Sequence, residues 1–361
     1  MQRAYCGAFI GVTGSCGKTT TTLLIERLLL ATGATGRGGR NDNVGRHLVR
    51  QLVKLRSPVD FVVQEVGISG PGSIVQLTDY VDVDVAVVTA VGTDHGSAFD
   101  APRSRQADAV AAEKGKLVEA VPATGFVCLN ADDPRVAAMA ARTSARVLTY
   151  GRAGHAELRA ENVEARWPSR LAFDLSVGGR TRRVETRFVG TIMLPNVLAA
   201  LSVVHGMGRD LDLAIAALAT VEPEPLHMSI VEGESGRTYV LDTFKAPLWS
   251  TELLAADLAN IGGSGTVFVL GEMSDLGTGL SARYARIVRI AAPLVDQVIL
   301  TGPAVSAEAK VRREGLANVL FAPTWVEAAE LVKGLPHKLV ILKSKSKNGF
   351  EKLPAAVEGD S

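Results

Sequence analysis

Hydrophobic and polar positions follow two alternating patterns along most of the chain. Short runs of β-branched and other apolar residues, typical of buried strands, are separated by longer stretches with helical spacing. In the first part of the chain these runs predict strands over 8–12, 60–66, 83–89 and 125–130. The helical spacing predicts helices over 18–31 and 104–120. Repeated strand–helix alternation is typical of a parallel sheet that is covered by helices on both faces.

The pattern changes between residues 155 and 190. Two alternating runs, 171–177 and 181–188, flank the pair Gly178-Gly179. Two glycines between alternating runs favour a β-hairpin. We therefore expect a small antiparallel sheet near 155–190, appended to the first domain.

The second half of the chain begins with two predicted helices, 196–207 and 211–219. The stretch 222–225, Glu-Pro-Glu-Pro, predicts an inter-domain connection, because proline interrupts both helices and ladders. Further strands are predicted over 239–242, 266–271, 297–300 and 338–342, and the tail 357–361 is expected to be frayed. The fold class is therefore α/β, with one doubly wound domain over 1–225 and a smaller one over 226–361.

Composition narrows the class of protein. The 361 residues carry 39 Lys+Arg and 38 Asp+Glu, a formal net charge of +1, which argues against a general nucleic-acid binder. A hydrophobic content of 47% supports two buried cores. No apolar run reaches the roughly 18 residues that a membrane helix needs, and the first residues lack the pattern of a signal peptide. We expect a cytoplasmic protein with no membrane or nucleic-acid partner; its oligomeric state is not predicted.

Cysteine usage excludes two further classes. The three cysteines, Cys6, Cys16 and Cys128, are too few and too scattered for a disulfide framework or a cysteine zinc site.

A phosphate-binding turn is predicted where the first strand meets the first helix. The stretch 11–20 reads GVTGSCGKTT. Its glycines allow backbone N–H groups to face phosphate oxygens, and the start of the helix adds positive potential. The residues predicted to contact nucleotide are Gly14, Ser15, Cys16, Gly17, Lys18, Thr19 and Thr20. Lys18 would reach the β- and γ-phosphates and Thr19 would ligate Mg²⁺. Val12 stands at the first glycine position of the strict motif, so the alternative is a glycine-rich turn with a surface lysine.

Other polar residues are candidates only in context. Glu65 ends a predicted strand, and the carboxyl edge of an open α/β sheet is where ligands bind, although a solvated strand end is the alternative. His95 alone would be an ordinary loop histidine. Lys114 lies in an alanine-rich stretch that favours its neutral, nucleophilic form; a lysine that extends to solvent along its helix is the alternative. Asp132 and Asp133 are interpreted mainly as a helix cap.

The ordered series of motifs resembles the Mur ligase family, especially its D-alanyl-D-alanine-adding branch. The stretches that carry the resemblance are 11–20, QEVGISGPG at 64–72, VTAVGTDH at 88–95, AEKGKL at 112–117, LNADDP at 129–134 and VLGEMSDLG at 269–277. The resemblance spans about residues 8–350. It implies a P-loop-type central ATP-binding domain followed by a Rossmann-like C-terminal domain.

The resemblance also implies a reaction. In this family a substrate carboxylate attacks the γ-phosphate of ATP, and an amine then attacks the acyl-phosphate. The resemblance makes Lys18, His95 and Lys114 catalytic residues, and it makes Thr19, Glu65, His95 and Lys114 metal ligands. Lys114 would act as a carbamate formed with CO₂, which helps to hold a second Mg²⁺. The expected partners are ATP, a carboxylate-bearing acceptor and an amino acid or peptide amine donor.

Several departures from the family pattern suggest a specialised branch. The phosphate loop begins at residue 11, so we expect no UDP-sugar-binding domain, and an acceptor of the folylpolyglutamate-synthetase or poly-amino-acid type is easier to accommodate. Asn196 is retained from the family's asparagine-rich helix and is expected at the nucleotide. The family's linker Gly-Arg reads Leu226-His227.

The resemblance also implies a second nucleotide-binding segment at 242–250. There Asp242 is expected to bind ribose, Phe244 to stack on adenine, and Lys245 to face the transferred phosphate. The lysines within 343–347 either face an acidic substrate or form a solvated patch.

Two competing functions remain from the sequence. One is the synthetase part of an amidating complex with a separate glutaminase subunit. The other is a nucleotide-binding regulatory or scaffold protein derived from the family. The intact set of Lys18, Thr19, Glu65, His95 and Lys114 argues against the second.

Overall fold

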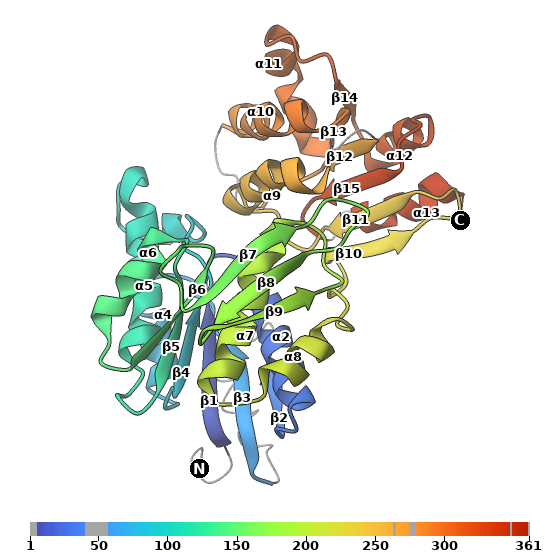
Figure 1. The fold of residues 1–361 in the computed structure, drawn as a ribbon. Coiled ribbons are helices and arrows are strands. Elements are labelled where there is room, and N and C mark those ends of the chain that lie inside the picture. Colours follow the sequence, from blue (N-terminus) through green and yellow to red (C-terminus); the bar gives the residue numbers. More distant parts are fainter. Residues whose placement is uncertain (1–5, 40–56, 263–264, 275–278, 347–348, 360–361) are drawn as a thin grey trace. The chain divides into compact units, whose positions relative to one another are not determined.

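The chain forms two compact units in a computed structural model, which describes residues 6–39, 57–262, 265–274, 279–346 and 349–359 (Figure 1). Unit 1 comprises 1–163, 172–186 and 193–221. Unit 2 comprises 164–171, 187–192 and 222–361. Within these described ranges, no helix has the length and apolar character needed to cross a bilayer.

Unit 1 is built on one sheet with the strand order β2-β3-β1-β4-β5-β6-β7-β8-β9. Its strands are β1 (Cys6–Thr13), β2 (Gly36–Gly39), β3 (Val59–Glu65), β4 (Val85–Val88), β5 (Phe126–Asn130), β6 (Arg146–Gly151), β7 (Leu158–Glu164), β8 (Ala172–Val177) and β9 (Arg180–Glu185). The strands from β2 to β7 in this order pair in parallel. Because β1 lies between β3 and β4 and runs parallel to both, the loops that follow these three strands leave the same edge of the sheet.

Helices cover both faces of this sheet (Figure 1). The helices of unit 1 are α2 (Lys18–Ala31), α4 (Ser73–Thr78), α5 (Gln106–Glu119), α6 (Pro134–Ala137), α7 (Leu194–Gly206) and α8 (Leu211–Leu218), with 3₁₀ turns η1 (Gly96–Ala98), η2 (Arg103–Arg105) and η3 (Ala138–Arg142). A further 3₁₀ turn, η4 (Thr191–Met193), begins in unit 2 and ends in unit 1. Helices α2, α7 and α8 pack together, and α4, α5 and α6 form the other layer. An apolar core of α4, α5 and strand residues lies beneath that second layer. The predicted helix over 18–31 is confirmed to the residue.

The small antiparallel sheet predicted near 155–190 is not a sheet of its own, because its strands extend the sheet of unit 1. The hairpin itself is present, because β8 and β9 pair in antiparallel fashion. However, β7 pairs with β6, and the hairpin strands continue the same sheet. The backbone groups of an edge strand accept a further strand whatever the local side-chain pattern, so this pattern did not reveal the connection.

Unit 2 is a smaller α/β layer with the strand order β10-β11-β15-β12-β13-β14. Its strands are β10 (His227–Glu232), β11 (Thr238–Asp242), β12 (Thr266–Leu270), β13 (Gln297–Thr301), β14 (Val319–Ala322) and β15 (Leu339–Lys343). Its helices are α9 (Leu248–Ile261), α10 (Leu280–Ala291), α11 (Glu308–Arg313), α12 (Trp325–Lys333) and α13 (Leu353–Glu358), with turns η5 (Ala292–Leu294), η6 (Gly302–Ala307) and η7 (Phe350–Lys352). Only β10 is antiparallel to its neighbour among the strand pairs described here. The two-unit α/β fold class is thereby confirmed.

The expectation of a frayed C-terminal tail is wrong for its first two residues. Val357 is buried in the core of unit 2, and Glu358 lies at the end of α13. The Glu358 carboxylate accepts hydrogen bonds from the Tyr239 hydroxyl at 2.6 Å and from the backbone N–H and hydroxyl of Ser235 at 2.7 and 2.8 Å. These contacts come from β11 and the turn before it, so the local sequence could not reveal them.

Candidate functional site

The phosphate loop joins β1 to α2 at the carboxyl edge of the unit 1 sheet. Gly17 caps α2 with a φ of 77°, in the left-handed region that favours glycine. Gly14 has a φ of 152°, and a Cβ at this position would lie only 1.8 Å from the Thr89 hydroxyl oxygen. These two glycines are therefore required by the loop's backbone and by its close approach to the residue after β4.

Two lysines from distant parts of the chain meet at this loop. The Lys18 Nζ donates to the Gly14 carbonyl at 2.9 Å, and the Lys114 Nζ donates to the same oxygen at 3.0 Å. Lys114 comes from α5 and is completely buried. Its Nζ also lies 3.7 Å from the Asp94 carboxylate. The structure thus excludes the alternative in which Lys114 extends to solvent.

The surroundings of Lys114 change its protonation. Burial lowers the pKa of Lys114 to about 8; the nearby Asp94 carboxylate opposes this, and the Lys18 ammonium adds to it. The Asp94 side chain is 9% exposed, and its Oδ1 is buried with no hydrogen-bond partner among the described residues. Asp94 is a site residue that the sequence reasoning missed. Its place directly before His95, in the loop that follows a buried strand, was the available signal.

The candidate metal ligands are partly brought together. The Thr19 hydroxyl donates to the Glu65 carboxylate at 2.8 Å, and Glu65 is buried at the end of β3. Hydroxyl and carboxylate oxygens suit a hard cation such as Mg²⁺, and the unpartnered Asp94 oxygen adds a further donor of this type. His95 is exposed, with a left-handed φ of 54°, where it caps η1. In the ranges covered by the structure, no three His, Cys, Asp or Glu side chains already form a metal-binding group.

The remaining predicted nucleotide contacts differ in burial and in position. Ser15 and Thr20 are buried, and the Ser15 hydroxyl oxygen accepts from the Gly92 N–H at 2.6 Å, so Ser15 faces the protein. Cys16 is half-buried. Asn196 lies on α7, where its amide oxygen accepts from Thr21 at 3.4 Å and would lie 2.0 Å from a Cβ on Gly17.

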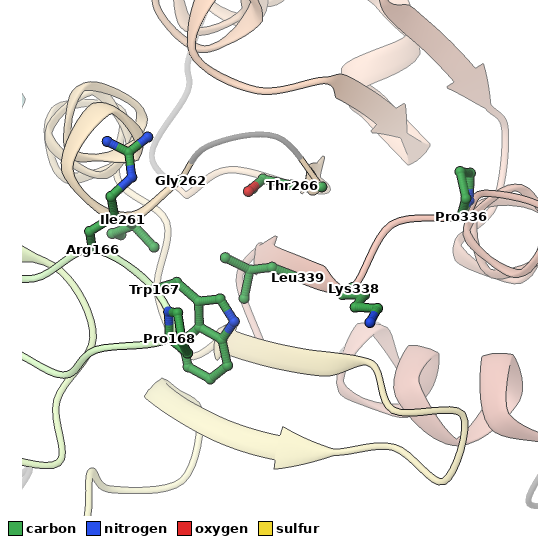
Figure 2. Close-up of a pocket in the computed structure, with 10 residues that line it drawn as sticks. Arg166, Trp167, Pro168, Ile261, Gly262, Thr266, Pro336, Lys338 and Leu339 are labelled. Carbon is green, nitrogen blue, oxygen red and sulfur yellow. The ribbon is translucent and has the colours of Figure 1, made fainter.

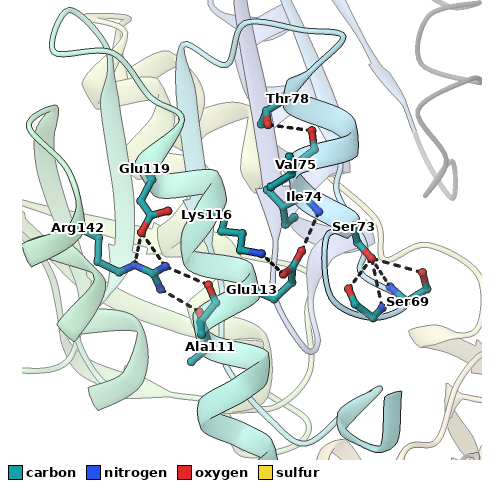
Figure 3. Close-up of polar contacts among 12 residues, drawn as sticks. Ser69, Ser73, Ile74, Val75, Thr78, Ala111, Glu113, Lys116, Glu119 and Arg142 are labelled. Atoms are coloured by element: carbon teal, nitrogen blue, oxygen red, sulfur yellow. Dashed lines mark hydrogen bonds and ion pairs between the residues drawn. The ribbon is translucent and has the colours of Figure 1, made fainter. Parts of the chain in front are cut away.

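Helix α5 also holds the loop that follows Glu65 (Figure 3). The buried Glu113 carboxylate accepts from the Ile74 N–H at 3.0 Å and from Lys116 at 2.6 Å. Burial alone would raise the pKa of Glu113, but the hydrogen bonds from Lys116 and the backbone of Ile74 outweigh it and lower the pKa. The Ser73 hydroxyl closes the turn by accepting from the Ser69 and Gly70 N–H groups at 3.1 and 3.2 Å. Adjacent residues of α5 therefore contact the phosphate loop and the start of α4.

The second predicted nucleotide segment lies in unit 2. The Lys343 Nζ, at the end of β15, contacts Asp242 at 2.5 Å and the Lys245 carbonyl at 2.9 Å. The Phe244 ring lies 4.7 Å from the His227 ring, and the Lys245 Nζ lies 5.7 Å from the Phe244 centroid. Lys343 therefore contacts Asp242 and the Lys245 backbone, and the Lys245 side chain lies over the Phe244 ring. The residues 275–277 of the motif at 269–277, and Lys347, lie outside the described residues.

A pocket of about 580 Å³ lies elsewhere in unit 2 (Figure 2). It is lined by residues at the amino-terminal ends of β12 and β15, among them Thr266 and Leu339, and by Trp167. None of the predicted site residues lines it. Asp242 and Lys343 stand at the opposite, carboxyl ends of their strands, where open α/β sheets bind ligands, so the pocket is not the candidate site.

Two known protein domains match this chain in sequence. The Mur ligase middle domain matches residues 12–204, and the Mur ligase glutamate ligase domain matches residues 228–346. The UDP-N-acetylmuramoyl-tripeptide--D-alanyl-D-alanine ligase of Mycobacterium tuberculosis (strain ATCC 25618 / H37Rv) is 31% identical over 309 residues, which cover 83% of this chain and 59% of the relative. The chain thus spans less than two thirds of the length of this curated relative.

Solved structures show the same fold. MurF from Acinetobacter baumannii superposes with a TM-score of 0.84 at 22% identity, covering 98% of this chain and 76% of that one. The MurF ligase from Thermotoga maritima, in complex with ADP, gives a TM-score of 0.83 at 19% identity, covering 99% and 81%.

The parallel sheets and the glycine-capped loop at the start of α2 define a two-unit α/β protein with a glycine-rich loop between its first strand and first helix. The chain belongs to the Mur ligase family, as the resemblance of its motifs implied.

Proposed function

We propose that the protein is an ATP-dependent amide ligase that joins an amino acid or peptide amine to a carboxylate-bearing acceptor. The observation that carries the proposal is the meeting of Lys18 and Lys114 at the Gly14 carbonyl, beside the Thr19–Glu65 pair. The Lys18 ammonium at a glycine-rich helix start favours a polyphosphate, and a buried carboxylate with a hydroxyl favours its magnesium ion. Family membership supports the same reaction.

The proposed reaction has two balanced steps. An acceptor carboxylate oxygen attacks the γ-phosphorus of ATP, the bond to the β-phosphate bridging oxygen breaks, and ADP leaves. The amine nitrogen then attacks the acyl carbon of the acyl-phosphate, phosphate leaves, and the amine loses a proton. Because both reactants of the first step are anions, the protein's main task is to supply positive charge and to position the groups.

Each candidate residue has a role in this scheme. The Lys18 ammonium leaves the Gly14 carbonyl to contact the β- and γ-phosphates, while loop N–H groups bind the phosphate oxygens. Thr19 and Glu65, with His95 and carbamoylated Lys114, would hold magnesium, which neutralises phosphate charge when bound. Asn196 contacts the nucleotide. In unit 2, Asp242 and Phe244 would bind ribose and adenine, and Lys245 would face the transferred phosphate.

The acceptor is the finer part of the proposal. The curated relative acts on a UDP-N-acetylmuramoyl-tripeptide and D-alanyl-D-alanine, as its name states. We propose that this chain uses an acceptor carboxylate of that type or of the folylpolyglutamate type. Residues 12–204 and 228–346 match the middle and glutamate ligase domains of the family, which supports an acceptor within this range.

The decisive experiment measures phosphate release and product mass with ATP, Mg²⁺, candidate acceptors and mixed amino acids or D-alanyl-D-alanine. Turnover that requires both an acceptor and an amine supports a ligase. Product formed only with ammonia would favour the synthetase part of an amidating complex. Nucleotide binding without turnover would favour a regulatory protein.

Lys18→Ala is the matched test of the loop. We expect turnover to fall at least 100-fold, because the phosphate charge loses its cation, while the circular dichroism spectrum stays unchanged. Lys352→Ala, which removes an exposed lysine after the last strand, is the control and should keep the wild-type rate. A near-normal rate for Lys18→Ala would contradict the assignment of the loop.

A further inference from the structure

Thr89, the residue that follows β4, is hydrogen-bonded to the phosphate loop from the interior of the protein. Thr89 is buried, and its hydroxyl oxygen lies 2.6 Å from the Cys16 carbonyl and 3.3 Å from the Thr13 carbonyl. A hydroxyl has one proton to donate, and the shorter distance favours the Cys16 carbonyl as its acceptor. The same hydroxyl leaves no room for a Cβ on Gly14.

This bond fixes the direction of a peptide plane. In a trans peptide the C=O and the following N–H point in opposite directions. Because the Cys16 carbonyl points inward to Thr89, the N–H of Gly17 points away from the protein interior. Outward N–H groups are what a phosphate-binding turn requires.

Neighbouring bonds hold the loop in the same place. The Ser15 N–H donates to the Ala90 carbonyl at 2.8 Å, and the Gly92 N–H donates to the Ser15 hydroxyl at 2.6 Å. The residues Thr89 to Gly92 therefore contact three successive loop residues, Gly14 to Cys16.

Thr89 is itself held by the next strands of the sheet. The Asn130 side-chain amide, at the end of β5, donates to the Thr89 carbonyl at 2.9 Å. The Asp133 carboxylate accepts from the Val91 N–H at 2.8 Å, and the buried Tyr150 hydroxyl of β6 donates to the Val88 carbonyl at 2.9 Å. The backbone before and after Thr89, at Val88 and Val91, is thus hydrogen-bonded to side chains that do not belong to the loop.

We propose that Thr89, supported by Asn130, is a positioning residue that holds the phosphate loop in its nucleotide-binding conformation. Neither side chain needs to touch the nucleotide. Thr89 acts through the Cys16–Gly17 peptide, and Asn130 acts through the Thr89 carbonyl. This inference rests on the proposed function, because it takes the loop's ligand to be a nucleotide phosphate.

The test is the affinity for ADP with Mg²⁺, measured by isothermal titration calorimetry on the full chain. Thr89→Val keeps the shape of the side chain and leaves the Cys16 carbonyl without its partner, so we expect the Kd to rise about tenfold. Thr89→Ser restores the hydroxyl and should return the Kd to within about twofold of wild type. This rescue separates loop positioning from simple packing.

Thr22→Val is the matched control. Thr22 is a buried threonine of α2 whose hydroxyl has no hydrogen-bond partner in the described part of the chain. The substitution removes a hydroxyl without breaking a hydrogen bond, so the Kd should not change. Equal Kd values for Thr89→Val and wild type would overturn the inference.

Folding is monitored by circular dichroism and thermal melting. If Thr89→Val does not fold, Asn130→Ala carries the test, and an unchanged Kd in a folded Asn130→Ala protein would overturn the inference, whereas a several-fold rise supports it. Failure of the wild-type protein to bind ADP would instead contradict the proposed function.

Discussion

Lys18 and Lys114 lie against one carbonyl oxygen, and like charges in so small a space repel each other. The Lys114 Nζ has the Asp94 carboxylate nearby, at 3.7 Å. A phosphate between the two lysines would remove the repulsion, and so would conversion of one ammonium to a carbamate anion. The residue-level geometry therefore suits both the unmodified and the carbamoylated forms of Lys114, which experiment can separate.

Carbamoylation of Lys114 should be visible directly. We expect a carbamate signal in ¹³C NMR of protein equilibrated with ¹³C-bicarbonate, absent from Lys114→Ala and retained in Lys116→Ala, the neighbouring lysine of α5. Because CO₂ reacts with the neutral amine and the pKa of Lys114 is about 8, the signal should grow as the pH rises from 7 to 9. Full wild-type activity of Lys114→Ala would reject a catalytic role.

Thiol chemistry offers a second test at the residue scale. Burial raises the pKa of Cys128 to about 12, whereas Cys16 is half-buried in the phosphate loop. Iodoacetamide should therefore modify Cys16 and spare Cys128 in the folded protein. ADP with Mg²⁺ at ten times its Kd should slow this modification roughly tenfold, because only the free protein reacts. Peptide mass spectrometry reads both sites, and equal rates with and without ADP would show that the loop does not bind it.

At the scale of elements, α5 combines several functions in one turn. Lys114 faces the phosphate loop and Glu113 binds the start of α4. Gly115 makes room for Arg142, since a Cβ there would lie 2.0 Å from the guanidinium. Arg142 in turn donates to the carbonyls of Ala111 and Ala112 of the helix (Figure 3). In this lysine–glycine pair, Lys114 therefore contacts the site, and Gly115 allows Arg142 to pack against the helix.

Helix α13 depends on a carboxylate near its end. Burial alone would raise the pKa of Glu358, but hydrogen bonds from Tyr239 and Ser235 lower it below its usual value of 4.5. Its contribution to stability is therefore present above about pH 4.5 and is lost as the pH falls through the folded-state pKa.

We expect Glu358→Gln to lower the free energy of unfolding by about 1–2 kcal/mol at pH 7, and less as the pH falls below 4.5. Urea unfolding at several pH values measures the difference. Glu330→Gln, on α12, is a control without a hydrogen bond of this kind to β11. A Glu358→Gln effect that is independent of pH would contradict the stabilising role of the ionised Glu358 carboxylate.

At the scale of the whole molecule, the chain crosses between its two units several times. The segments 164–171 and 187–192 both belong to unit 2, and both are hydrogen-bonded to α9. The Trp167 N–H donates to the Ile261 carbonyl at 3.0 Å. Asp257 accepts from the Ile192 N–H at 2.8 Å and from the Thr191 hydroxyl. Unit 2 is therefore completed by residues that precede its main stretch of sequence.

A fragment of residues 222–361 should consequently be less stable than the same unit in the full chain. It lacks the partners of Asp257 and the buried Leu171, Phe188 and Val189. We expect a loss of several kcal/mol, by apolar burial alone, and a lower melting temperature or aggregation. In the full chain, Asp257→Ala should lower stability by about 2–3 kcal/mol. A fragment as stable as the intact unit would contradict this account.

The amino-acid sequence by itself determined the local elements and the order of the motifs. The helix 18–31, the strands around the phosphate loop and the glycine hairpin all follow from periodicity and turn residues, which act over a few positions. Lys18, Thr19 and Glu65 were predicted as site residues because glycines and strand ends mark the edge where ligands bind. The strand β2 was not predicted, because Gly36–Gly39 has no hydrophobic pattern and is held by its backbone pairing to β3.

Only the tertiary structure decided which distant residues meet. Lys114 and Gly14 are 100 positions apart, and Thr89 and Cys16 are 73 apart. Asp94 at Lys114, the continuation of the sheet through β7, and the capture of Glu358 by β11 likewise depend on the neighbours that folding supplies. The physical reason is that hydrophobic patterning specifies which face of an element is buried, whereas strand order and side-chain packing specify what that face contacts.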